Sequence, residues 1–309
     1  MNDIGIKSFS THQVLHDLDD GILKRIVSEL TFERTFDVAS LVGKYFRSDT
    51  ADLPFLRGPI NSTVLIANNG ALSRLDNTNI LLQNRGGTGV IVNYKGRKFL
   101  ITATHVIGNI GFGKPANLSV YQKINSDIAT LSLDEMKLIY SSQKAPEAGL
   151  PVGDIAIFSY DGDIEGVKVR NLAENEKITD TFAIGYPGKY RKVWAEHLDP
   201  LISYGSASLK SKQQQNLRTA EYFQKLVSRM TAEQLEMYTK RTQIRNLDKV
   251  IFSGVAMPGN SGGGLFDKDG NLLAVCRGAE GTIGKETGMH EFYPVAELLD
   301  ELDKRGLLS

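Results

Sequence analysis

The sequence predicts a mainly β protein, either a barrel or a sandwich, on three observations. From Thr63 onward the chain consists largely of short apolar bursts separated by Gly, Asn, Asp and Pro residues. These bursts do not alternate regularly with helices, which argues against a parallel α/β sheet. Glycine contributes 30 of the 309 residues, above the typical share of ~7%, and this excess favours many tight turns. The expected strands lie at 63–67, 89–94, 98–102, 117–121, 137–140, 154–158, 181–185, 201–204, 250–252 and 271–275.

Three segments have helical rather than strand periodicity. Apolar residues recur at steps of three and four over 11–47, which predicts two helices, the second running to about Phe46. Residues 211–245 contain neither Gly nor Pro and predict a helical insertion, and 295–302 after Pro294 predict a final helix. Because the N-terminal helices each carry one apolar face, they must dock, either on the next domain or on a regulatory partner.

Composition and charge exclude several classes of function. Lys plus Arg and Asp plus Glu both number 36, whereas a protein that binds nucleic acid or an anionic membrane usually has a basic excess. No apolar run approaches the ~18 residues of a membrane span, and the N-terminus does not resemble a secretory signal. We therefore expect a cytoplasmic protein that binds neither nucleic acid nor membrane, although a chain from which a signal had been removed would look the same.

Neither a metal nor another cofactor is expected. The single cysteine, Cys276, excludes an intramolecular disulfide and a zinc site with several cysteines. His12 and His16 share the i, i+4 spacing of a helical metal site but lack the accompanying glutamate of the HExxH motif.

The segment Pro258-Gly-Asn-Ser-Gly-Gly-Gly-Leu265 carries the strongest chemical signal. Glycines around Ser261 allow a substrate to approach closely and let backbone N–H groups converge on an oxyanion. A phosphate-binding P-loop is excluded because no Lys-Ser/Thr pair follows at the required spacing. The α/β-hydrolase nucleophile elbow is disfavoured, because three consecutive glycines begin a helix poorly. A simple glycine turn remains the alternative.

Two further motifs precede this serine. Leu100-Ile-Thr-Ala-Thr-His105 runs an apolar strand into a histidine, and Asp154 stands at the start of another apolar strand. Each is ordinarily structural when alone, but His, Asp and Ser in this order on a β-rich chain predict a serine-hydrolase site. Asp127 is a rival acid, disfavoured because it follows His105 too closely for a strand hairpin to be completed between them.

These motifs resemble the chymotrypsin-fold serine peptidases, most closely the bacterial HtrA/Deg-type and related intracellular trypsin-like peptidases, without a PDZ domain after the last helix. Further motifs of the resemblance are Gly87-Thr-Gly89-Val, Ala183-Ile-Gly-Tyr-Pro-Gly188 and Gly270-Asn-Leu-Leu-Ala-Val275. The resemblance implies two six-stranded antiparallel β-barrels with the active site between them. The expected division is an N-terminal helical extension (1–55), a first barrel with His105 and Asp154 (56–165), a second barrel with Ser261 and the helical insertion (166–290), and a C-terminal helix (291–309).

The resemblance also implies residue roles. It makes His105 the general base, Asp154 its orienting acid and Ser261 the nucleophile, with the N–H groups of Gly259 and Ser261 as the oxyanion hole. It places the primary specificity pocket at Val255, Cys276, Arg277, Gly278, Gly288 and His290. Because Val255 offers no carboxylate, we expect cleavage after small or medium apolar residues rather than Lys or Arg, with Glu or Gln as the alternative if His290 points inward.

The function predicted from the sequence is therefore a serine endopeptidase that works through an acyl-enzyme and acts on a protein or peptide substrate. The alternative is a catalytically silent pseudo-protease or scaffold. In both cases the helices within 11–47 or 211–245 are the candidate contacts for a regulatory protein partner.

Overall fold

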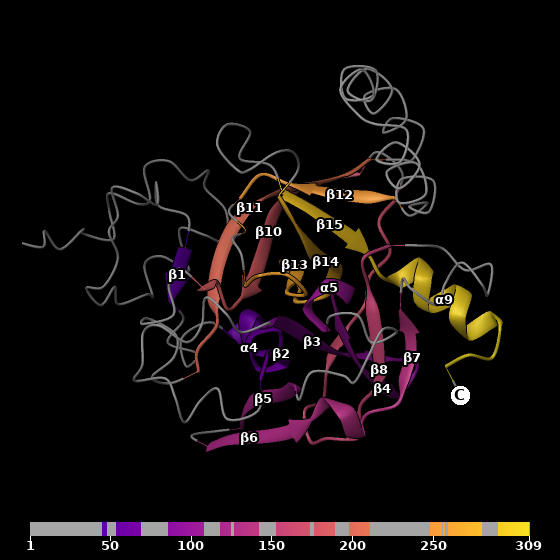
Figure 1. The fold of residues 1–309 in the computed structure, drawn as a ribbon. Coiled ribbons are helices and arrows are strands. Elements are labelled where there is room, and N and C mark those ends of the chain that lie inside the picture. Colours follow the sequence, from indigo (N-terminus) through magenta and orange to yellow (C-terminus); the bar gives the residue numbers. More distant parts are fainter. Residues whose placement is uncertain are drawn as a thin grey trace, which may run out of the picture.

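Two β-sheets that share an apolar core make up most of the described chain (Figure 1). The computed structural model describes residues 45–47, 54–68, 86–107, 118–124, 127–141, 153–173, 176–188, 198–210, 248–254, 256, 259–279 and 290–308. The N-terminal helices predicted before residue 45 and the insertion predicted at 211–245 lie outside these residues. Among the described helices, none is long and apolar enough to cross a membrane.

The C-terminal sheet is a closed barrel of six antiparallel strands. Its strands follow the order β11, β10, β13, β14, β15 and β12, and β12 pairs back onto β11. A short seventh strand, β1, extends the sheet beyond β11. The barrel strands are β10 (Lys177–Gly185), β11 (Leu201–Lys210), β12 (Lys249–Phe252), β13 (Gly264–Asp267), β14 (Leu272–Ala279) and β15 (His290–Pro294).

The N-terminal sheet has eight strands, in the order β6, β5, β2, β3, β4, β8 and β7, with β9 parallel to β3. Within the described residues its edge strands β6 and β7 do not pair, so this half differs in detail from the expected six-stranded barrel. The mainly β class is confirmed. The strands are β2 (Thr63–Asn68), β3 (Gly86–Tyr94), β4 (Arg97–Thr102), β5 (Leu118–Ile124), β6 (Asp127–Ser132), β7 (Leu138–Ser141), β8 (Ala156–Ser159) and β9 (Val167–Lys168).

The largest apolar cluster lies between the sheets rather than inside one of them. It joins Val90 and Ile101 of the first sheet to Phe182 and Val275 of the second. Each sheet also has a cluster of its own. Burial of this shared interface fixes how the two sheets meet, and therefore how side chains at their facing edges are placed.

The C-terminal helix α9 (Ala296–Lys304) confirms the helix predicted after Pro294. It follows the last strand of the second sheet but docks on the first. Leu299 is fully buried in the shared core, and Asp303 forms ion pairs with Lys95 at 2.7 Å and Arg97 at 2.8 Å on the β3–β4 hairpin. The helix thus ties the two sheets together.

Other local predictions need correction. Phe46, expected near the end of a helix, lies in strand β1 (Tyr45–Arg47), opposite Ile202 of β11. The proposed boundary around Pro54 begins a helix, α4 (Pro54–Ser62). In both places pairing with a distant strand or packing on the core overrides the local pattern. Strands β1, β6, β9, β13 and β15 were not among those expected.

Truncation of Leu299 to Ala should lower the free energy of unfolding by about 2–5 kcal/mol, because it leaves a cavity in the shared core. The exposed Leu307, which is 42% accessible, provides the control: Leu307→Ala should change stability little. Urea unfolding followed by circular dichroism measures both. Equal effects of the two substitutions would contradict the docking of α9 described above.

Candidate active site

The first half of the site is built where β4 and β8 end side by side. Thr102 lies opposite Ala156 in the register of these strands. The short helix α5 (Thr104–Ile107) follows β4, and Asp154 stands just before β8. Antiparallel pairing therefore brings His105 and Asp154 to the same edge of the sheet, although 49 positions separate them in the chain.

Two hydrogen bonds join this histidine to this carboxylate. His105 Nδ1 lies 2.6 Å from Asp154 Oδ2, and the backbone N–H of His105 donates to Asp154 Oδ1 at 3.1 Å. The neighbouring Thr104 hydroxyl donates to the carbonyl of Ile155 at 2.6 Å. The His105 side chain is 49% exposed and that of Asp154 is 18% exposed. Asp154 therefore holds the imidazole ring through Nδ1, while about half of the His105 side chain remains exposed to solvent.

The second half is the glycine-rich turn before β13. Gly262 N–H donates to the carbonyl of Cys276 and Cys276 N–H to the carbonyl of Gly263, both at 2.8 Å. Gly259 and Gly262 have φ angles of +102° and +85°, a region that other residues rarely adopt. A methyl group on Gly262 would lie 2.0 Å from the carbonyl oxygen of Thr88. These glycines are needed both for the turn and for its close approach to the first sheet.

Strand β3 brings the two halves together. Thr88 N–H donates to the carbonyl of Ser261 at 2.8 Å, and the Thr88 hydroxyl donates to the carbonyl of Gly259 at 2.7 Å. A methyl group on Gly87 would lie 2.7 Å from the Ser261 carbonyl and 2.6 Å from Val106, the residue after His105. The serine turn and the histidine helix therefore meet across β3.

The Ser261 hydroxyl donates to the carbonyl of Arg277 at 3.4 Å, which is a long hydrogen bond. Within the described residues, the N–H groups of Gly259 and Ser261 have no acceptor. Backbone N–H groups that converge beside a nucleophile form an oxyanion-binding site, and these two stay the predicted donors for that role. The described residues thus contribute a serine hydroxyl and an imidazole that is oriented by a carboxylate.

The remaining predicted residues divide into three groups. Val255 and Gly288 lie outside the described residues. The Cys276 side chain is 2% exposed and belongs to the core of the second barrel, so it presents no side chain to a substrate. Gly278 and His290 lie on the facing strands β14 and β15, where Gly278 pairs with Glu291 and His290 pairs with Ala279.

The rival acid Asp127 begins β6, an edge strand of the first sheet. Strands β5, β2 and β3 separate it from β4, which leads into His105. The structure therefore places Asp154, and not Asp127, against the histidine.

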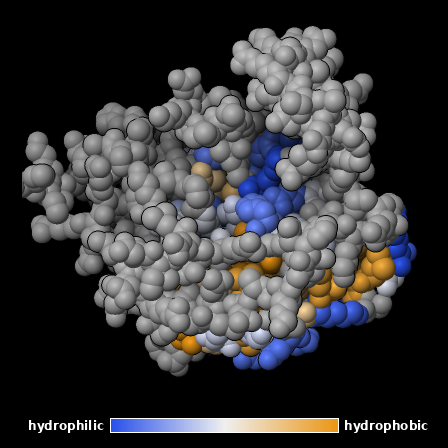
Figure 2. All heavy atoms as spheres, viewed as in Figure 1, coloured by the Kyte–Doolittle hydropathy of each residue, from blue (hydrophilic) through white to orange (hydrophobic). Residues whose placement is uncertain are grey.

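Sequence reasoning missed a chain of ionic side chains beside the serine. Glu291 is 5% exposed and binds Lys249 at 2.8 Å through one oxygen and Arg277 through the other. In Figure 2 a hydrophilic patch occupies the face between α5 and the strands β12 and β15. The available signal was a carboxylate, Glu291, directly before the aromatic pair Phe292-Tyr293 in a strand whose residues from Glu291 onward are all buried. Among the described residues, no three His, Cys, Asp or Glu side chains gather as metal ligands would.

A comparison with protein families gives the decisive match. The model of the trypsin-like peptidase domain matches residues 87–275, which is more than half of the chain and includes His105, Asp154 and Ser261. The chain belongs to the trypsin-like peptidase family. The prediction of a trypsin-like serine peptidase is thereby confirmed at the level of the family. The roles of individual residues and the HtrA/Deg-type subtype stay predictions.

Two further comparisons accompany this match. A search of curated proteins finds none that matches this peptidase. Among solved structures, the chain is similar to the inactive form of a serine-to-alanine mutant of Rv3671c from M. tuberculosis H37Rv. The identity is 15% and the TM-score 0.45, and the match covers 84% of this chain and 95% of the other.

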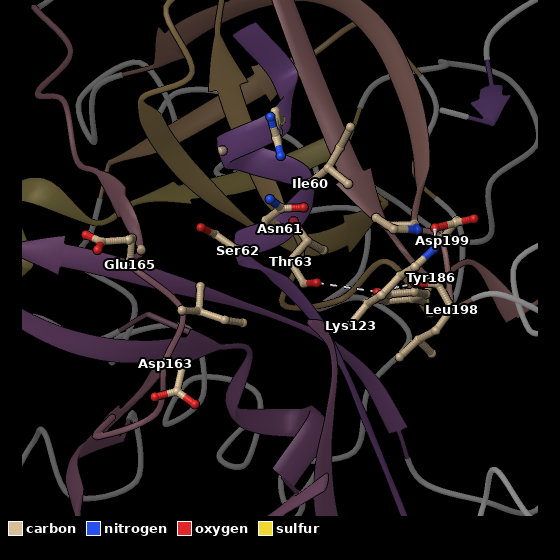
Figure 3. A pocket seen from close by; sticks show the side chains of 15 residues that line it. Ile60, Asn61, Ser62, Thr63, Lys123, Asp163, Glu165, Tyr186, Leu198 and Asp199 are labelled. Carbon is tan, nitrogen blue, oxygen red and sulfur yellow. Dashed lines mark hydrogen bonds and ion pairs between the residues drawn. The ribbon is translucent and has the colours of Figure 1, made fainter. Parts of the chain in front are cut away.

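A cavity of about 570 Å³ is lined mainly by residues of α4, of the segment 163–166 and of the segment 198–200 (Figure 3). Its lining includes the ion pair of Lys123 with Asp199, at 2.6 Å, and the buried Tyr186. Burial raises the pKa of the Tyr186 hydroxyl, which donates to the carbonyl of Leu198 at 3.2 Å. None of the residues predicted for the site lines this cavity, so it is separate from the candidate active site.

Gly262→Ala should abolish reaction of Ser261 with a fluorophosphonate probe and should destabilise the peptidase, because the new methyl group would collide with Thr88. Gly96→Ala is the matched control. Gly96 also has a positive φ, +79°, but nothing lies within 4 Å of its added methyl group, so only the ~1–2 kcal/mol of left-handed strain applies. Probe labelling and thermal unfolding measure both. Full labelling of Gly262→Ala would show that the serine turn does not need the close contact between Gly262 and Thr88.

Proposed function

We propose that this peptidase is a serine endopeptidase that hydrolyses peptide bonds through Ser261, His105 and Asp154. The observation that carries the proposal is the doubly hydrogen-bonded His105–Asp154 pair, positioned across β3 from the serine turn. A carboxylate bonded to Nδ1 fixes the imidazole tautomer that leaves the other nitrogen able to accept a proton. On the sequence grounds given above, we place the enzyme in the cytoplasm.

The proposed mechanism has two half-reactions. Ser261 Oγ attacks the scissile carbonyl carbon while His105 takes the hydroxyl proton, and the N–H groups of Gly259 and Ser261 stabilise the oxyanion. His105 then gives the proton to the leaving amine, which breaks the peptide bond and forms the acyl-enzyme. Water, activated by the same histidine, hydrolyses the ester and restores Ser261.

One movement must precede attack. The Ser261 hydroxyl is bonded to the carbonyl of Arg277 rather than to His105. In the proposed mechanism the hydroxyl gives up this long hydrogen bond and forms one to the imidazole instead. The hydrogen bond from the Ser261 hydroxyl to the Arg277 carbonyl also favours the alternative function, a catalytically silent binding protein. In that protein the hydroxyl would keep this hydrogen bond and would not be activated. Reaction of Ser261 with a fluorophosphonate distinguishes the two, because only an activated serine is phosphonylated.

Substitution of Ser261 or His105 by Ala should lower peptide hydrolysis by several orders of magnitude, because triad residues act as a unit. Asp154→Asn should cost roughly 10⁴-fold by favouring the wrong tautomer. Asp127→Asn, the same chemical change on the edge strand β6, is the control and should be nearly silent. Hydrolysis of a casein or peptide-library substrate and probe labelling are the measurements. A larger loss in Asp127→Asn than in Asp154→Asn would overturn the assignment of the acid.

We propose further that the substrate residue before the scissile bond is small or medium and apolar, not Lys or Arg. The carboxylate nearest to Gly278 on the facing strand, Glu291, is already bonded to Lys249 and Arg277. It therefore has no free oxygen to compensate a buried cationic side chain, which would be costly to desolvate alone.

A positional-scanning peptide library tests this specificity. Apolar residues should dominate in the wild-type profile and in His290→Ala. A dominant preference for Lys or Arg would contradict the proposal. A preference for Glu or Gln that disappears in His290→Ala would instead support the alternative in which His290 reads the substrate.

A further inference from the structure

The carbonyl oxygens of Gly259, Asn260 and Ser261 in the serine turn are all bonded inside the protein. The Gly259 oxygen accepts the Thr88 hydroxyl at 2.7 Å, and the Ser261 oxygen accepts the Thr88 N–H at 2.8 Å. The Asn260 oxygen accepts the N–H of Gly263 at 2.7 Å. Two of the three bonds therefore come from one residue of the first sheet, and only the bond to Gly259 comes from a side chain.

The partners of the Thr88 hydroxyl fix the direction of its hydrogen bonds. The backbone N–H of Tyr186 can only donate, and it lies 3.0 Å from Thr88 Oγ1. A hydroxyl has one proton and can also accept, so its proton is left for the Gly259 carbonyl, which can only accept. Because Thr88 is fully buried, loss of the hydroxyl would remove one partner from each of these groups in a place that solvent does not reach.

The segment on the far side of this hydroxyl is itself anchored. Tyr186 is 2% exposed, and its phenol donates to the carbonyl of Leu198 at 3.2 Å. A methyl group added to Gly259 would lie 2.5 Å from the Tyr186 carbonyl oxygen, so the two backbones are in contact. A methyl group on Gly185, the last residue of β10, would lie 3.1 Å from Thr88 Oγ1. The hydroxyl therefore lies in a closed contact between the end of β10 and the serine turn.

The orientation of the peptide units in this turn matters for the chemistry. The tetrahedral intermediate carries negative charge on an oxygen, which N–H donors stabilise and a carbonyl oxygen would repel. The C=O and N–H groups of one trans peptide unit point in opposite directions. The unit that carries the Ser261 N–H is held by the bond of the Asn260 carbonyl, and the units on both sides of it are held by Thr88.

We infer that Thr88 is a positioning residue of the active site: its hydroxyl, bonded to Gly259 and Tyr186, holds the serine turn in the orientation that leaves N–H groups, and not carbonyl oxygens, for the oxyanion. The inference rests on the proposed function. It concerns the side chain and not the backbone of β3, because the Thr88 N–H bonds to Ser261 whatever the side chain is. A side chain without a donor at this position releases the Gly259 carbonyl and keeps the backbone bond.

Two pairs of variants isolate the hydroxyl. Thr88→Val replaces it by a methyl group, and Thr88→Ser and Thr88→Ala differ from each other only by a hydroxyl on Cβ. In peptide hydrolysis, kcat should fall about 10²-fold from the wild type to Thr88→Val and by a similar factor from Thr88→Ser to Thr88→Ala, the loss typical of a misplaced catalytic geometry. KM should change little, and Thr88→Ser should retain most of the wild-type kcat.

Thr181→Val is the matched control. Thr181 on β10 is also fully buried, and its hydroxyl donates to the carbonyl of Gly205 at 2.7 Å, outside the serine turn. Thr181→Val should therefore lower stability to urea, as Thr88→Val does, but should leave the kcat of the folded fraction near the wild-type value. Equal kcat values in Thr88→Ser and Thr88→Ala, or an equal loss in Thr181→Val, would show a merely structural role and overturn the inference.

A second measurement separates this inference from the proposed function, because it does not depend on catalysis. Hydrogen–deuterium exchange of peptides that cover residues 259–264 reports on the opening of the turn. Exchange should be faster in Thr88→Val and Thr88→Ala than in the wild type, and should stay slow in Thr88→Ser and Thr181→Val. If the wild type neither hydrolyses peptides nor reacts with a fluorophosphonate, the proposed function fails. Unchanged exchange in both variants that lack the hydroxyl would overturn the inference itself.

Discussion

The hydrogen bonds of Thr88 join the two sheets at the candidate site, and the position of the serine turn relative to His105 depends on them. Its N–H binds the carbonyl of Ser261, and its hydroxyl donates to Gly259 and accepts from the N–H of Tyr186 at 3.0 Å. Its own carbonyl accepts the hydroxyl of Thr102, near the end of the strand that leads into His105. All polar groups of one fully buried residue are satisfied, each by a segment that shapes the site.

In the second sheet, buried carboxylates fix the position of strand β14. Asp267 is 3% exposed at its side chain and accepts from Asn271 and the N–H of Asp269, which fixes the hairpin between β13 and β14. Glu291 fixes the opposite side of β14 through Arg277. The strand that carries the Ser261 acceptor is therefore held at both ends by carboxylates whose oxygens are all bonded, as burial of charge requires.

Helix α9 links the two sheets. It follows β15 of the second sheet in the chain, but it docks on the first sheet. Its apolar face lies in the shared core, and its charged face binds the β3–β4 hairpin. Strand β3 is thus fixed at one end by the serine turn and at the other by α9. A rigid β3 keeps the histidine and serine halves in one relative position, which is what positioning a nucleophile against its base requires.

The sequence by itself determined the mainly β class, the final helix and the residues of the candidate triad, because these depend on local patterns: short apolar bursts, a glycine-rich turn and an ordered His, Asp and Ser. Only the tertiary structure decided what depends on distant pairing. The strand at Phe46 exists because β11 pairs with it. The choice of Asp154 over Asp127 follows from strand order. The inward placement of Cys276 and the turn of Arg277 toward Glu291 follow from barrel closure and a bulge, which no local pattern encodes.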